Sequence, residues 1–335
     1  MSVAVALLPV VVFLAALFVM DTFRLVRPAA IMWAVAYGAL AAGVASIVNR
    51  GALDAGWATD FVSRYLAPVI EEALKSAFVV ALIATGRVGF LVDAVVHGFA
   101  VGTGFALVEN VSYLQTLSDV GMTTWLVRGL GTAMLHGSTT AIFAIVAKTA
   151  SDRRQVLAFV PAFLGPVVIH SAFNHRLLPT SAQALLLLVL LPMLVIAVFA
   201  RSERATREWI GAGLDLDLEL LNLVSSETFT VTRFGRYLQE LRTRLPGPAV
   251  ADMFCLLRLE LELSVQAKGL LIAREAGLDP PAHPDLDAAL RERSFLHASI
   301  GRAGRLALKP LQVTSRTDRW HRHLLRSRSN GPAPR

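Results

Sequence analysis

The sequence predicts an all-α fold: a polytopic membrane bundle of about seven transmembrane helices, followed by a cytoplasmic helical C-terminal region. The 335 residues are 55% hydrophobic with a mean hydropathy of +0.56, which is too apolar for a soluble globular protein. The apolar residues also form runs of about 20 residues, the length that spans a bilayer. Seven such runs lie at roughly 2–20, 29–48, 64–84, 88–108, 125–147, 157–178 and 181–200.

Basic residues predict the orientation of these spans, because loops rich in Lys and Arg stay in the cytoplasm. The first run has no basic residue before it and no small-x-small cleavage site, so we interpret it as a retained span and not as a signal peptide. With the N-terminus outside, the inner loops hold Arg24, Arg27, Arg87, Lys148, Arg153 and Arg154, and the outer loops hold Arg50, Arg176 and, at a helix start, Arg64. We therefore expect a multi-pass protein of the cell membrane with its C-terminus in the cytoplasm.

The net charge and the cysteine count indicate which partners and which kinds of site the protein can have. The net charge of +7 follows from the loop asymmetry and from a basic tail, so we expect no nucleic-acid partner. Cys255 is the only cysteine, which excludes an intrachain disulfide and a thiolate metal cluster.

The third span carries Glu71, Glu72 and Lys75 within its apolar run. Each charge costs about 2.5–3.5 kcal/mol at the bilayer centre, whereas each large apolar residue returns about 0.3–0.6 kcal/mol. These charges must therefore face other helices or trapped water, and their spacing allows all three to lie on one side of a helix. A structural ion pair is the alternative, but one glutamate would suffice for it. Pro68, one turn before Glu71, is expected to loosen the helix and leave backbone carbonyls free near the carboxylates.

The first, second and seventh spans have no ionisable residue in their apolar cores, so we assign them packing and no chemistry. In the fourth span, Gly98 and Gly102 form a small-xxx-small pair that lets a neighbouring helix approach. The same span brings a third carboxylate in Glu109, followed by Asn110.

The fifth and sixth spans contribute histidines. His136 lies at mid-depth of the fifth span, and His170 and Asn174 are four residues apart in the sixth, where they share a face. One such histidine alone is best explained by a hydrogen bond between helices.

The predicted topology places these polar residues at a similar depth. At 1.5 Å per residue they fall within a slab roughly 10–15 Å thick toward the extracytoplasmic side. The members of this set are Glu71, Glu72, Glu109, His136, His170 and Asn174. His97 lies about 18 Å along the helix from Glu109 and is not part of it.

Glutamates and histidines that converge in a membrane can activate water. A carboxylate in a low-dielectric cavity serves as a general base, and neighbouring carboxylates can share a proton. Histidine and asparagine can donate to an oxyanion. The same residues could bind zinc, although the H-E-x-x-H signature of soluble proteases is absent. The cofactor is therefore none or zinc, and a metal, if present, would have His136, His170, Glu71, Glu72 and Glu109 as its candidate ligands.

Four short motifs resemble the PrsW family of intramembrane proteases, which is related to CAAX-prenyl-protease-like enzymes. The motifs are Glu71-Glu72-Ala73-Leu74-Lys75, Phe105-Ala106-Leu107-Val108-Glu109 with Asn110, the single His136, and His170-Ser171-Ala172-Phe173-Asn174. Their order and spacing agree over roughly residues 30–200, and the long tail is not covered.

The resemblance implies a membrane-embedded endopeptidase, with family members that include site-1 proteases of a membrane-anchored anti-sigma factor. It implies Glu71 and Glu72 as water-activating residues and His136 and His170 as polarising or oxyanion partners. Glu109 completes the catalytic set. Lys75, Asn174 and Asn110 would support it. The implied partners are a membrane-anchored protein substrate and the lipid bilayer.

From Arg201 the composition changes, with 21 Lys/Arg and 16 Asp/Glu up to the last residue. Apolar residues recur at helical spacing in 214–224 and 253–276, with breaks at 246–248 and 279–281. We expect a transmembrane protease-like bundle over 1–200 and a cytoplasmic helical domain over 201–315 that can bind a cytoplasmic partner. A basic, disordered tail over 316–335 would bind anionic lipid.

Two other classes of function fit a polytopic protein of this kind. A proton-coupled transporter also uses intramembrane Glu and His residues, but it predicts polar residues from one face to the other and often a repeated half. Here the polar residues gather toward the outside and no internal repeat is apparent. A non-catalytic scaffold would keep the fold and use the tail for partners, whereas all four motifs are intact in this chain.

Overall fold

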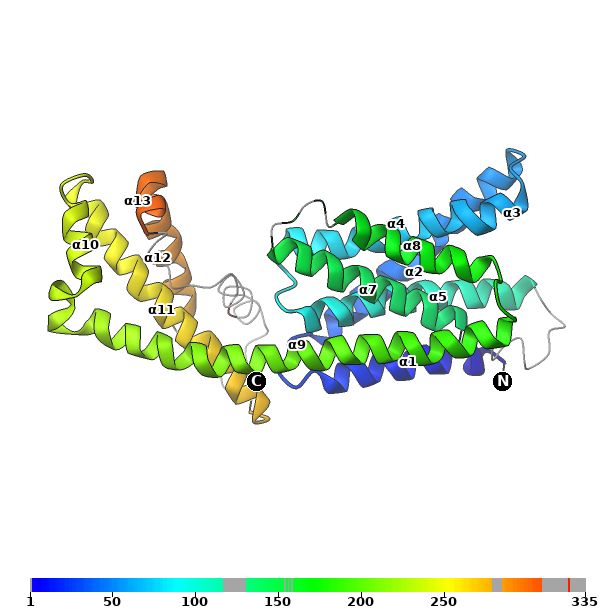
Figure 1. The fold of residues 1–335 in the computed structure, drawn as a ribbon, viewed down its shortest axis with the longest axis horizontal. Coiled ribbons are helices and arrows are strands. Elements are labelled where there is room, and N and C mark those ends of the chain that lie inside the picture. The colour runs from blue at the N-terminus through cyan, green and yellow to red at the C-terminus, as the bar shows by residue number, and fades with distance from the viewer. Residues whose placement is uncertain are drawn as a thin grey trace. The chain divides into compact units, whose positions relative to one another are not determined.

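A computed structural model describes residues 2–116, 131–153, 155, 157, 159–278, 285–308 and 325. Within these ranges the chain forms helices and turns and no strand, so the predicted all-α class is confirmed (Figure 1). The chain divides into two compact units, Met1–Arg204 and Ala205–Arg335.

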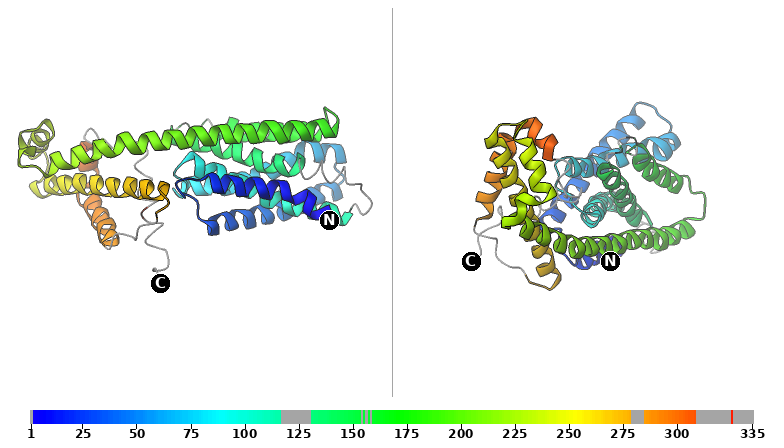
Figure 2. Two further views of the ribbon diagram at one scale, coloured as in Figure 1. Left: turned by 90° about the horizontal axis from the view of Figure 1, so that it is seen from below. Right: turned by 60° about the vertical axis from the view of Figure 1, so that its left-hand side comes forward.

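The first unit is a bundle of helices that lie side by side (Figures 1 and 2). Its elements are α1 (Ser2–Met20), α2 (Pro28–Asp54), α3 (Thr59–Phe61), the π-helix η1 (Val62–Leu66), α4 (Ala67–Ala84), α5 (Leu91–Thr116), α7 (Ala133–Asp152), α8 (Phe159–Asn174) and the first part of α9 (Thr180–Ser225). Each predicted apolar run coincides with a helix, except that the start of the fifth run, 125–130, lies outside the described residues.

Among the described residues, three helical segments are long and apolar enough to cross a membrane. They are Pro28–Asp54, Leu91–Tyr113 and Leu185–Ser225, and the shorter segments Leu8–Met20 and Phe159–Asn174 are also apolar. α4 contains three charged residues, and α7 contains a polar stretch from His136 to Thr140, so their composition alone does not mark them as spans. The predicted number of seven spans stays a prediction.

α5 lies at the centre of the bundle and contacts α1, α2, α4 and α7. The apolar segment of α5 is 83% buried, compared with 28% for that of α2. A Cβ atom at Gly98 would lie 2.7 Å from the carbonyl oxygen of Thr140, and one at Gly102 would lie 2.1 Å from that of His136. The predicted glycine pair is therefore the place where α7 packs against α5 with no room for a side chain, and it fixes the backbone that carries His136.

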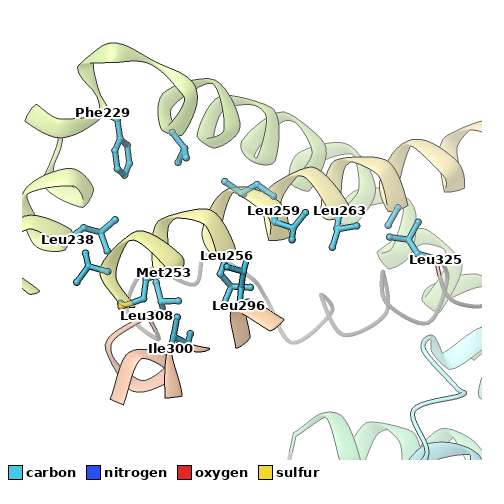
Figure 3. Packing of buried hydrophobic residues seen from close by; sticks show 14 of the residues in the cluster. Phe229, Leu238, Met253, Leu256, Leu259, Leu263, Leu296, Ile300, Leu308 and Leu325 are labelled. Atoms are coloured by element: carbon cyan, nitrogen blue, oxygen red, sulfur yellow. The ribbon is translucent and has the colours of Figure 1, made fainter. Parts of the chain in front are cut away.

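The second unit comprises the rest of α9, the 3-10 helix η4 (Glu227–Val231), α10 (Arg233–Leu241), α11 (Gly247–Glu275), α12 (Leu286–Ser299) and α13 (Gly301–Leu308). Its core is formed by apolar side chains of α11, α12 and α13. Met253 and Leu256 of α11 lie there with Leu296 of α12 and with Ile300, which precedes α13 (Figure 3). The predicted break at 246–248 spans the end of the gap between α10 and α11 and the first two residues of α11, and the predicted break at 279–281 lies outside the described residues. α9 runs without a break through the predicted boundary at residue 200. The predicted basic tail lies outside the described residues apart from Leu325.

Candidate active site

Three helices of the first unit bring ionisable side chains into one buried cluster. α4 contributes Glu71, Glu72 and Lys75, α7 contributes His136, and α8 contributes His170. Glu72, Lys75 and His136 are fully buried, and Glu71 and His170 are 9% and 3% exposed. Charged groups this deep within a bundle require partners close by, and the contacts among them define the site.

Glu72 is the residue on which the other helices converge. Its Oε1 atom accepts from Lys75 Nζ at 2.7 Å and contacts His170 Nδ1 at 2.9 Å. Thr139 Oγ1 on α7 donates to the same atom at 3.3 Å. One carboxylate oxygen thus joins α4, α7 and α8, and these donors favour its ionised form.

The two histidine rings lie edge to face, with centroids 5.0 Å apart. His170 Nδ1 contacts the Glu72 carboxylate at 2.9 Å, and its Nε2 lies 3.7 Å from Glu71 Oε2. His136 Nδ1 accepts from the Lys75 ammonium at 3.0 Å, so its Nε2–H donates to Glu109 Oε2 at 2.7 Å. The partners on one ring nitrogen therefore determine the role of the other.

Glu71 has one engaged and one unengaged oxygen. Its Oε1 accepts from Asn49 Nδ2 of α2 at 3.3 Å, whereas its Oε2 is buried with no hydrogen-bond partner among the described residues. Ligand atoms of Glu71, His136 and His170 lie within 4.8 Å of one another. Two imidazoles and a carboxylate are the donor set of many catalytic zinc sites, and the unengaged oxygen of Glu71 suits a ligand. Glu71 and His170 therefore fit a metal ion, and His136 would join them only by exchanging its bond with Lys75 or Glu109 for the metal.

Comparison with protein families matches residues 27–200 to the description "PrsW family intramembrane metalloprotease". The chain belongs to this family. The predicted resemblance is thus confirmed, and with it the assignment as a membrane protein of a family of intramembrane proteases. No curated protein and no solved structure matches the chain. The match contains every predicted site residue and leaves the second unit outside it.

The PrsW family match also contains Asn174, which the structure places away from the Glu/His cluster. Asn174 Nδ2 donates to the carbonyl of Ser63 at 2.8 Å, and Ser171 Oγ donates to the carbonyl of Arg64 at 2.6 Å. Pro68 has no N–H to bond the carbonyl of Arg64 four residues earlier, and the π-helix η1 loosens the same turn. The carbonyls expected to be free near the carboxylates are therefore bound by residues of α8 instead.

Other predicted residues lie around the cluster. Glu109 contacts it through His136, and its side chain is 25% exposed. Asn110 is fully buried next to Glu109 in sequence. His97 lies outside the cluster as expected, with Nδ1 2.8 Å from the carbonyl oxygen of Asp93.

Two contacts in this PrsW-family site are not anticipated from the sequence. Thr139 and Asn49 reach Glu72 and Glu71, and Asn49 directly follows the second apolar run, 29–48, to which we assign packing and no chemistry from the sequence. The reason is physical: neutral side chains cost little in a membrane and give no energetic signal of the kind that marks Glu71. The only sequence signal for Asn49 is that it ends the second apolar run on the side where the glutamates were expected.

Proposed function

We propose that the protein is an endopeptidase that hydrolyses a peptide bond of a membrane-anchored protein near the extracytoplasmic face. The observation that carries this proposal is the buried cluster of Glu71, Glu72, His136 and His170, in which Glu71 Oε2 has no hydrogen-bond partner among the described residues. Family membership supports it. An anti-sigma-type regulator is the substrate class that the family resemblance suggests.

The orientation of the spans belongs to the same proposal. With seven spans and the N-terminus outside, α4 would run inward and α8 outward, and the cluster would lie in the outer half of the bilayer. A bond just outside or just within the outer leaflet would then reach Glu71.

The contacts support the following role for each side chain. Glu71 Oε2 accepts the proton of the attacking water, whose oxygen bonds to the carbonyl carbon of the scissile peptide. His170 donates an N–H to the developing oxyanion when its Nε2 is protonated, and His136 does so when its Nε2–H turns from Glu109. The C–N bond then breaks, and the proton held by Glu71 passes to the departing amine. Glu72 does not take part directly: held by Lys75 and Thr139, it fixes the His170 ring.

A metal would be held by Glu71, His136 and His170. When bound, it would polarise the peptide carbonyl and lower the pKa of water as a Lewis acid. Glu72 would keep its role toward His170, because its carboxylate orients the nitrogen opposite the ligating one.

The test is cleavage of a single-span substrate by the full-length protein in liposomes, with the cleaved bond located by mass spectrometry. We expect one cut at the outer boundary of the substrate's span, and a loss of at least 100-fold in rate for Glu71→Gln and His170→Ala. Glu240→Gln, at an exposed residue of the second unit, is the matched control and should cleave at the wild-type rate. Cleavage by Glu71→Gln at the wild-type rate would refute the proposal.

A further inference from the structure

Asn49 of α2 contacts the cluster from a helix on which the sequence shows no ionisable residue within the apolar run. Its Nδ2 donates to Glu71 Oε1 at 3.3 Å. The cation of the site, Lys75, is directed to Glu72 and His136 instead. Asn49 therefore binds Glu71 with a neutral donor, which holds one oxygen in place without forming an ion pair, and Oε2 is left toward His170 Nε2 at 3.7 Å.

The position of Asn49 is set by the packing of α2. Tyr37 of α2 donates through its hydroxyl to the carbonyl of Leu74 on α4 at 2.9 Å. A Cβ atom at Gly38 would lie 1.9 Å from the carbonyl oxygen of Val101, and one at Gly104 would lie 1.9 Å from that of Val35. α2 and α5 are thus in backbone contact, so Asn49 extends from a helix that cannot easily shift, as a precise site requires.

The other end of the Asn49 amide has no partner. Its Oδ1 atom is buried and accepts no hydrogen bond from any described residue. A buried acceptor left unpaired costs stability, so its retention beside a reactive carboxylate points to a donor that arrives with a ligand. A peptide backbone in extended form supplies such N–H donors next to each carbonyl.

We propose that Asn49 is a positioning residue with two contacts: its amide N–H fixes Glu71, and its amide oxygen accepts a backbone N–H of the peptide substrate. The second contact rests on the proposed protease function. The first contact does not, because it concerns only Asn49 and Glu71.

Steady-state cleavage in liposomes separates the two contacts, with KM expressed as substrate mole fraction in the bilayer. Asn49→Asp keeps the acceptor oxygen and loses the donor to Glu71. We expect kcat to fall about 10- to 100-fold, as for other groups that orient a ligand or base, with KM within about twofold of wild type. Asn49→Leu, of similar size, loses both contacts, so kcat should fall by the same factor and KM should rise about tenfold. Ser46→Ala, at an exposed position one turn earlier, should match wild type.

Thermal unfolding of the same full-length proteins in detergent tests the first contact without any substrate. We expect Asn49→Leu to lower the unfolding temperature in the wild-type background but to have little effect in the Glu71→Leu background. Equal lowering in both backgrounds would overturn the positioning role. Asn49→Leu with wild-type kcat and KM would overturn it as well. An Asn49→Leu variant that loses kcat alone would overturn the substrate contact. Absence of cleavage by the wild-type protein would instead count against the proposed function, and the unfolding comparison would still decide the first contact.

Discussion

At the scale of single residues, Lys75 shows how tightly the site is built. Its side chain is fully buried and forms an ion pair with Glu72 at 2.7 Å, while its Nζ also lies 5.0 Å from the centroid of the Phe105 ring. A buried ion pair adds little net stability relative to apolar residues, but removing one partner leaves an uncompensated charge. The pair is thus best understood as part of the site and not as a stabilising device.

We predict that Glu72→Gln lowers the free energy of unfolding by about 3–5 kcal/mol, because it leaves the Lys75 ammonium without its carboxylate. The double variant Glu72→Gln/Lys75→Met should recover most of this loss, since both charges are then absent. Unfolding of the proteins in detergent micelles measures the effect. A single variant as stable as wild type would show that Lys75 is not held by Glu72.

Asp21, which follows the end of α1, makes the stability of the protein depend on pH. It is 5% exposed and accepts the Val26 N–H at 2.9 Å. Its pKa is raised from 3.8 to about 7, chiefly by burial and in smaller part by the negative charges of Asp93 and Glu203, and the hydrogen bond from the Val26 N–H opposes the rise. Between about pH 4 and pH 7 the folded protein keeps this proton while the unfolded chain has lost it, so stability falls as the pH rises through that range.

We therefore expect Asp21→Asn to be more stable than wild type above pH 7, by up to about 4 kcal/mol, and to lose that advantage as the pH falls to about 4. The measurement is the difference in unfolding temperature between the two proteins from pH 4 to pH 8.5, in which contributions of other groups cancel. A difference in unfolding temperature that does not change with pH would contradict the raised pKa of Asp21 in the folded protein.

At the scale of elements, close approach of helices sets the geometry of the site. Gly102→Ala would place a methyl group against the carbonyl of His136, so α5 and α7 must separate. We predict a loss of about 1–3 kcal/mol in stability and a larger relative loss of cleavage, because His136 moves. Gly43→Ala, where an added Cβ meets nothing within 4 Å, should be neutral or stabilising by up to about 1 kcal/mol. Unfolding and cleavage assays compare Gly102→Ala with Gly43→Ala. Equal stability and equal cleavage rates of the two variants would show that close packing at Gly102 does not position His136.

Hydrogen bonds between α8 and η1 also set the geometry of the site. Because Asn174 binds the carbonyl of Ser63 and not the Glu/His cluster, Asn174→Ala should reduce cleavage by about tenfold, the effect of one hydrogen bond, and not abolish it. Ser171→Ala removes the neighbouring bond to Arg64 and should act similarly. Complete loss of cleavage in Asn174→Ala, with normal folding, would place Asn174 in the chemistry instead.

The difference at Asn174 also shows what the sequence could and could not reveal. Helical spacing placed Asn174 on the face of His170, yet it lies one turn farther along α8, at the level of the π-helix. Glu71, Glu72 and His136 were found because burying a charge or an imidazole in a membrane is costly. Thr139 and Asn49 were missed because they are neutral, and periodicity gives no sign of a π-helix. The apolar runs predicted the helices well, since a bilayer fixes their length.

At the scale of the whole molecule, the proposed orientation places the second unit in the cytoplasm. Cys255 is the only cysteine and is exposed on α11 of the second unit, so it is a native probe for the side on which this unit lies. We predict that a membrane-impermeant maleimide does not label Cys255 in intact cells and does label it in inverted vesicles. Cys255→Ser/Arg50→Cys should give the opposite result. Labelling of Cys255 in intact cells would reverse the proposed topology.

The most direct test of the whole account is cleavage of a single-span substrate by the full-length protein in liposomes, before and after a chelator and after zinc is added back. With Glu71 as the general base, we predict cleavage that is lost in Glu71→Gln; a metal held by Glu71, His136 and His170 would in addition make cleavage sensitive to the chelator and restorable by zinc, except in His170→Ala. Cleavage that survives the chelator but is lost in Glu71→Gln would mean that the glutamate acts without a metal. Cleavage that persists in both Glu71→Gln and His170→Ala would contradict the assignment of this cluster as the active site.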